Sequence, residues 1–160
     1  MESLLDLMSS DPMSDRNSFL RSLLPRVPSE EEHRKHPFRQ MFLKEQDTNI
    51  TRIVLNFFQS VRDKWPESWG DLERKGNVLP KTNGFKALMR FLRIVYLDIS
   101  RDDREYVPDE SQFWPYFERV DLNDDDFNIE TFPPGTSGEA KLYKILLESL
   151  GSETGEAKLL

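Results

Sequence analysis

Apolar residues recur along this chain at the spacing of amphipathic helices, and one stretch dominates the pattern. Between Gly76 and Leu97, the turn signal Asn83-Gly84 is followed by apolar residues three and four positions apart, namely Phe85, Leu88, Met89, Leu92, Val95 and Tyr96. On a helix, Lys86, Arg90 and Arg93 share one narrow stripe, which we call the cationic seam, and nearly every other position is apolar. A helix that is apolar over most of its circumference lies inside a fold. The pattern therefore predicts a central helix near residues 83–98.

A second strong helix is predicted from Asp47 to Lys64. Its apolar stripe consists of Ile50, Ile53, Val54, Phe57, Phe58 and Val61. Asp47 or Thr48 can cap the first turn, and Trp65-Pro66 ends the helix. Because this helix is amphipathic where the central one is mostly apolar, we expect it to cover one side of the central helix. The residues expected to be buried together are Phe57, Phe58, Val61, Phe85, Leu88, Met89 and Leu92.

The amino-terminal third predicts short elements. Residues 2–9 and 14–24 have helical apolar faces, with Ser14 as the cap of the second and Phe19, Leu20, Leu23 and Leu24 as its apolar residues. Residues 25–28 form a proline-rich linker. Residues 29–36 are nearly all charged, so we expect them to be solvated.

The carboxy-terminal third predicts two more helices after an acidic connector over residues 98–110. The first covers residues 112–120, with Phe113, Trp114 and Phe117 as apolar residues, and it tolerates Pro115 only near its first turn. The second follows Thr136-Ser-Gly-Glu139, which matches a capping box, and it runs to Leu150 before Gly151 stops it.

These elements predict a mainly α protein, an irregular helical bundle around the central helix, because no convincing alternating strand is visible. Three regions are expected along the chain. Residues 1–46 form an amino-terminal helical and charged extension, residues 47–150 form the helical domain, and residues 151–160 form a flexible tail.

Composition and charge do not change the predicted fold, but they indicate the compartment in which the protein is expected. The 160 residues include no cysteine, which excludes disulfides and thiolate metal sites and fits a reducing compartment. The net charge of −7 is split unevenly, with +3 on residues 1–96 and −10 on residues 97–160. The amino terminus is acidic where a signal peptide would be basic, and arginines interrupt the longest apolar run. We therefore expect a cytoplasmic protein with no membrane partner.

Catalytic and cofactor signatures are scarce. The chain has no phosphate-binding loop of the GxxxxGK[ST] type and no GxGxxG fingerprint. His33 and His36 could share a helix face, but zinc needs further ligands, so a plain surface segment is the favoured interpretation. A calcium loop that begins at Asp121 fails, because Asp126 stands where glycine is required and Phe132 where glutamate is required. We expect no enzyme activity, no metal and no cofactor.

Two tryptophans, Trp65 and Trp69, flank a polar connector after the second helix. At this spacing they could stack on a base or another ligand. The commoner role of such residues is as buried anchors that fix a connector to the core, and we favour it.

The ordered pieces Ile50-Thr-Arg-Ile-Val54, Phe57-Phe58, Val61-Arg62, Trp65-Pro66, Trp69, Gly76-Asn-Val-Leu79, Lys81-Thr82 and Gly84-Phe-Lys-Ala-Leu-Met89 carry a family resemblance. Together with Pro134 to Glu139 and Leu142-Tyr143, they resemble the carboxy-terminal region of DGQHR-domain proteins over roughly residues 37–150. The resemblance implies kinship with bacterial proteins found near DNA-modification and phage-defence systems. The DGQHR motif of that family lies in an amino-terminal ParB-like core and does not occur in this sequence, so chemistry that depends on the core is not implied.

Two functional hypotheses follow. The first is a non-catalytic interaction or nucleic-acid-associated module of a DNA-modification or defence system, with Lys81 and the cationic seam on phosphates or an acidic partner. Its partners would be DNA, a ParB-like core protein or another defence-system protein. The alternative is an acidic protein-binding module, a mimic of nucleic acid, that engages a basic partner. Its expected surface residues are Asp121, Asp124, Asp125 and Asp126.

Overall fold

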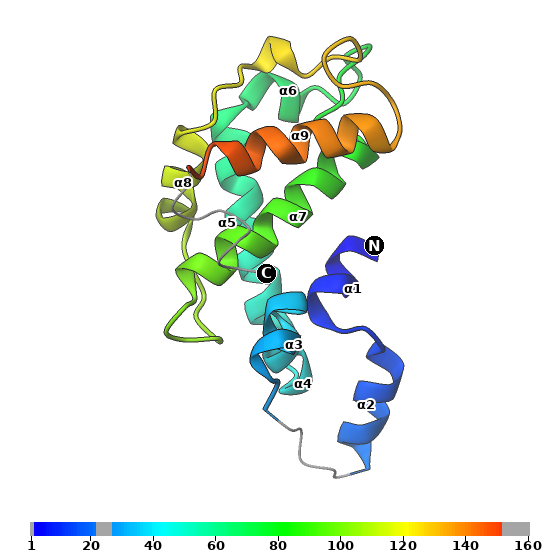
Figure 1. Cartoon of the computed structure of the whole chain (residues 1–160), viewed down its shortest axis with the longest axis vertical. Helices are drawn as coiled ribbons and strands as arrows, with labels where there is room; N and C mark the ends of the chain where they lie inside the picture. The colour runs from blue at the N-terminus through cyan, green and yellow to red at the C-terminus, as the bar shows by residue number, and fades with distance from the viewer. Residues whose placement is uncertain (1, 22–26, 152–160) are drawn as a thin grey trace.

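The computed structural model describes residues 2–21 and 27–151 of the chain, with the side chains of residues 2, 3 and 19 excepted. Within these ranges all regular structure is helical, which confirms the predicted mainly α fold (Figure 1). Leu23, Leu24 and residues 152–160 of the tail predicted over residues 151–160 lie outside the described residues. The elements are α1 (Glu2–Met8), α2 (Pro12–Leu20), α3 (Glu30–Lys35), α4 (Arg39–Leu43), α5 (Asp47–Lys64), α6 (Pro66–Gly70), α7 (Thr82–Ile99), α8 (Glu110–Glu118), the 3-10 turn η1 (Asp124–Asp126) and α9 (Thr136–Glu148).

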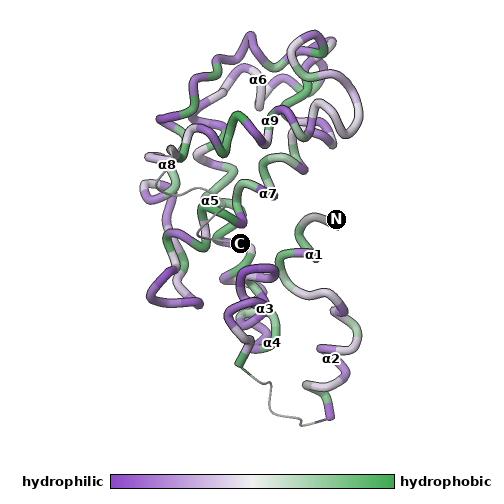
Figure 2. Tube along the Cα trace, in the orientation of Figure 1, coloured by the Kyte–Doolittle hydropathy of each residue, from purple (hydrophilic) through white to green (hydrophobic). Residues whose placement is uncertain are grey.

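Helix α7 is the central element, as predicted. Helices α9 and α1 both pack against α7, and α8 packs along α5 (Figure 1). Ten residues of α7 are buried, so only a narrow face of this helix remains polar. Figure 2 shows hydrophobic stretches along α5, α7 and α9. None of the described helices is long and apolar enough to cross a membrane.

Aromatic side chains connect α5 to α7 and α8. The ring of Phe57 is fully buried, with centroid distances of 6.5 Å to Phe91, 5.5 Å to Phe113 and 5.1 Å to Phe117. Such clusters stabilise a core beyond the burial of their area. Five of the seven expected core residues are buried, namely Phe57, Val61, Leu88, Met89 and Leu92. The other two, Phe58 and Phe85, are half-buried and stack on each other at 5.4 Å.

The first 46 residues contribute to the same hydrophobic core. Leu7, Phe38 and Met41 are all buried within it. The Phe38 ring meets Tyr96 of α7 edge-on at 4.9 Å, and the Phe38 N–H donates to the Leu7 carbonyl over 2.9 Å. The boundary predicted at residue 46 therefore does not coincide with a break in the core.

Several predicted helix starts need correction. Helix α2 begins at Pro12, and the Asp11 carboxylate accepts a hydrogen bond from the Ser14 N–H at 3.0 Å, so Asp11 is the capping residue in place of Ser14. Helix α5 spans the predicted residues, but Gln46 precedes it without a side-chain cap. Helix α8 begins at Glu110, two residues early, because Asp109 forms a capping box, and Pro115 consequently falls inside the helix.

The capping box predicted at Thr136 is also wrong. Gly135 precedes the helix with a φ of 88°, a backbone conformation that favours glycine, and Thr136 is already the first helical residue. No side chain caps this end. Glu139, the expected box partner, points instead towards α7.

Two glycines allow the first turns of α7 and α9 to lie against the backbone of the loops that precede them. A Cβ atom on Gly84, in the first turn of α7, would lie 2.2 Å from the Leu79 carbonyl oxygen and 2.6 Å from that of Val78. A Cβ on Gly138, in the first turn of α9, would lie 2.0 Å from the Pro133 oxygen. Both contacts are shorter than real side chains tolerate, so the chain approaches itself there in a way that requires glycine.

Candidate anion-binding pocket

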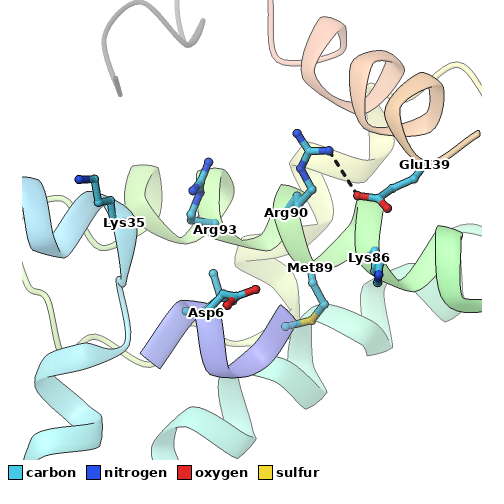
Figure 3. A pocket seen from close by; sticks show the side chains of 8 residues that line it. Asp6, Lys35, Lys86, Met89, Arg90, Arg93 and Glu139 are labelled. Atoms are coloured by element: carbon cyan, nitrogen blue, oxygen red, sulfur yellow. Dashed lines mark hydrogen bonds and ion pairs between the residues drawn. The ribbon is translucent and has the colours of Figure 1, made fainter. Parts of the chain in front are cut away.

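The cationic seam lies on the one polar face of α7 and lines a cavity of about 280 Å³ (Figure 3). The seam residues are one helical turn apart, so their side chains follow one another along this face. A fourth cation, Lys35, enters the lining from α3. The remaining lining residues are Asp6, Leu7, Met89 and Glu139. We call this cavity the seam pocket.

Arg90 is the most tightly held of the seam residues. Its guanidinium lies 3.9 Å from the centre of the Tyr143 ring and forms an ion pair with Glu139 at 3.4 Å. Both contacts connect α7 to α9, so Arg90 contributes to the packing of the two helices as well as to the charge of the pocket.

The other cations of the seam pocket are less engaged. Among the described residues, neither Lys86 nor Arg93 forms an ion pair, and the buried Nε of Arg93 has no hydrogen-bond partner. Lys35 pairs with Glu31 on its own helix at 2.7 Å, with both side chains well exposed. Since exposed pairs of this kind are weak, Lys35 can exchange Glu31 for a stronger anion.

Lys81 does not belong to this group. Its ammonium donates to the Leu72 carbonyl over 2.9 Å and so holds the connector before α7, and it does not line the seam pocket. Conversely, the sequence pattern did not point to Lys35, Asp6 or Glu139. They come from three other helices, and no local signal indicates that those helices meet α7 at this point.

The two connector tryptophans are anchors, and the base-stacking alternative is wrong for Trp65. This residue is 1% exposed and its indole N–H donates to the Leu122 carbonyl over 2.8 Å. Trp69 is half-buried and stacks on Phe58 at 5.2 Å.

The expected acidic surface is partly committed to holding the chain together. The Asp124 carboxylate accepts the Ser68 N–H at 2.6 Å, and the Asp126 carboxylate accepts the Asn123 N–H at 2.7 Å. Asp125 is paired with Arg74 at 2.9 Å but its side chain is 91% exposed. Asp121 is exposed as well. Of the four predicted residues, Asp121 and Asp125 are exposed, and Asp125 is engaged in the ion pair with Arg74.

The histidines do not lie in a solvated run as expected. His33 is 7% exposed and its buried Nδ1 has no hydrogen-bond partner. Burial lowers the pKa of His33, because the charged imidazolium loses its hydration. The Nδ1 of His36 contacts the Asp6 carbonyl instead of a shared metal position. In the part of the chain that the structure describes, no three metal-ligating side chains come together.

One carboxylate pair has perturbed titration. A hydrogen bond to Asp63 raises the pKa of Glu110, and the same hydrogen bond lowers the pKa of Asp63. Asp63 is exposed and Glu110 is half-buried, and neither residue lines the seam pocket. The pair connects the carboxy-terminal end of α5 to the amino-terminal end of α8.

Comparison with protein-family models, curated proteins and solved structures finds no match to this chain. The resemblance to the carboxy-terminal region of DGQHR-domain proteins therefore stays a prediction from the residues quoted for it. The functional feature that the structure provides is the seam pocket, which is lined by cations from α3 and α7.

Proposed function

We propose that this chain is a non-catalytic binding module that contacts the phosphate groups of a nucleic acid through its cationic seam. The observation that carries the proposal is the convergence of four cations, Lys35 and the three seam residues, on one cavity. Lysine and arginine on rigid helices neutralise backbone phosphates and release counterions. In the setting that the family resemblance implies, the nucleic acid is the DNA of a modification or phage-defence system.

The net charge of −7 opposes this function at long range but does not decide it. At physiological ionic strength, charges more than about 8 Å apart are largely screened, so the cations within the pocket dominate the local field. Arg93 adds a second argument, because its buried Nε has no hydrogen-bond partner among the described residues and a phosphate oxygen can accept from it.

The acidic protein-binding module has less support. Asp124 and Asp126 accept backbone hydrogen bonds within the chain, so they are not free to bind a basic partner. If nucleic acid does not bind, we expect the chain to bind a basic protein partner through its acidic surface instead.

The test is fluorescence anisotropy with labelled single-stranded and duplex DNA at 50 mM and 150 mM salt. We expect binding that weakens steeply with salt, and Lys86→Ala and Arg93→Gln should each flatten the dependence on log salt by about one unit. Lys144→Ala is the matched control, because Lys144 is an exposed cation of α9 whose ion pair with Glu148 lies within its own helix. Absence of binding at 50 mM salt contradicts the proposal.

A further inference from the structure

The seam pocket has walls on several sides. Lys35 comes from α3, Asp6 from α1, the seam from α7 and Glu139 from α9. Its volume of about 280 Å³ is near the lower end of pockets that hold small ligands, roughly 300 Å³. A cavity of this size receives one end group of a ligand and not the side of a double helix.

The two carboxylates determine how a nucleic acid strand can approach. Figure 3 shows Asp6 approaching from α1 below Arg93, and Glu139 approaching from α9 beside Arg90. A strand that continued past the pocket would bring further phosphates towards these carboxylates, and like charges repel. A strand that ends in the pocket places its last phosphate among the cations and avoids that repulsion.

The charge and donors of the pocket match a phosphate monoester. Four cations and two carboxylates give a formal charge of +2. A phosphate monoester carries about −1.5 to −2 near neutral pH and presents three strong acceptor oxygens, whereas each backbone diester carries a single charge. The unpaired Arg93 and Lys86, together with Lys35, supply donors from two directions, which suits three diverging oxygens better than two.

We propose that the seam pocket binds the terminal phosphate monoester of a nucleic acid strand, an inference that rests on the function proposed above and specifies its ligand. Arg93 holds the phosphate from α7 and Lys35 holds it from α3, and Lys86 adds charge. Asp6 disfavours strands whose backbone continues across the pocket.

The experiment compares internally labelled single-stranded DNAs of one sequence that end in hydroxyl groups, in a 5′-phosphate or in a 3′-phosphate. We expect one phosphorylated strand to bind at least tenfold more tightly than the hydroxyl strand. Arg93→Gln should remove this preference, and so should Lys35→Gln, whose exposed position on α3 makes loss of folding an inadequate explanation. Lys144→Ala should keep the preference. Asp6→Asn should tighten binding of the hydroxyl strand more than that of the phosphorylated strand.

The outcomes separate the two proposals. If all strands bind equally and the seam variants weaken them all, the nucleic-acid function stands and the terminal-phosphate inference is overturned. If no strand binds, both are overturned. A nucleoside monophosphate that competes as well as the phosphorylated strand would show that the strand contributes nothing, and this too would overturn the assignment to a strand end.

Discussion

Gly84→Ala tests the close approach between α7 and its preceding loop, on which the position of the cationic seam depends. Gly84 lies in the first turn of α7, two residues before Lys86. A methyl group there would meet two backbone carbonyl oxygens, those of Leu79 and Val78, at 2.2 and 2.6 Å. Because both sides of the contact are backbone, no change of rotamer can relieve it.

Two effects of opposite sign set the magnitude. Alanine is better than glycine inside a helix by roughly 0.5–1 kcal/mol, which favours the variant. Against this, Cβ contacts below 3.0 Å are essentially never seen, so the loop and the helix must separate by about 0.8 Å from the present 2.2 Å. Overpacking of a tight site costs about 1–3 kcal/mol, and a contact between backbone atoms belongs at the upper end. The net expectation is a loss of about 2 kcal/mol in the free energy of unfolding.

The assay is urea unfolding followed by tryptophan fluorescence, with thermal unfolding by circular dichroism beside it. For a chain of this size, a loss of 2 kcal/mol corresponds to a decrease in Tm of about 4–8 °C. Gly70→Ala is the matched control, since a Cβ at Gly70 has no atom within 4 Å and should change stability by less than about 0.5 kcal/mol. A Gly84→Ala variant as stable as the wild type would refute the close approach.

Three further predictions concern buried groups. Trp65→Phe should lower the free energy of unfolding by about 2 kcal/mol in urea titration, because it leaves the carbonyl that accepts the indole N–H unpaired; an unchanged midpoint would contradict the anchoring role. Asp124→Ala should cost about 1–2 kcal/mol, because its carboxylate accepts a buried backbone N–H, while Asp125→Ala should change stability by less than about 0.5 kcal/mol. Equal effects of the two aspartate variants on Tm would show that neither holds the fold. The pKa of His33 is lowered in the folded state. As the pH falls below about 6.5, the ordinary pKa of histidine, the unfolded chain therefore binds a proton at this position more readily than the folded chain does. The free energy of unfolding should decrease as a result. His33→Gln should reduce this loss between pH 7 and pH 5 in urea titrations; a wild-type pH dependence in His33→Gln would contradict the burial of this side chain.

The sequence by itself determined the two long helices and the cationic seam. Helix α5 has the predicted limits, and α7 extends the predicted central helix by one residue at each end. Both depend on a periodicity sustained over 18 residues, which specifies a buried face whatever it packs against. The seam follows from the same periodicity, because three cations one turn apart share a face on any helix.

Helix ends and side-chain environments were decided by the tertiary structure. The start of α9 depends on the backbone conformation of Gly135, and a residue pattern that matches a capping box does not contain that information. His33 lies in a run of charges, so only the packing of α3 against the rest of the chain reveals that it is buried.

The seam pocket shows the same division. Its α7 residues were predictable because they belong to one helix, whereas Lys35, Asp6 and Glu139 arrive from elements distant in the sequence. Their meeting depends on which faces of α1, α3 and α9 are buried against α7. The buried faces are determined by non-local packing, in which many weak contacts between distant segments add up. The spacing of residues within one helix therefore does not predict them.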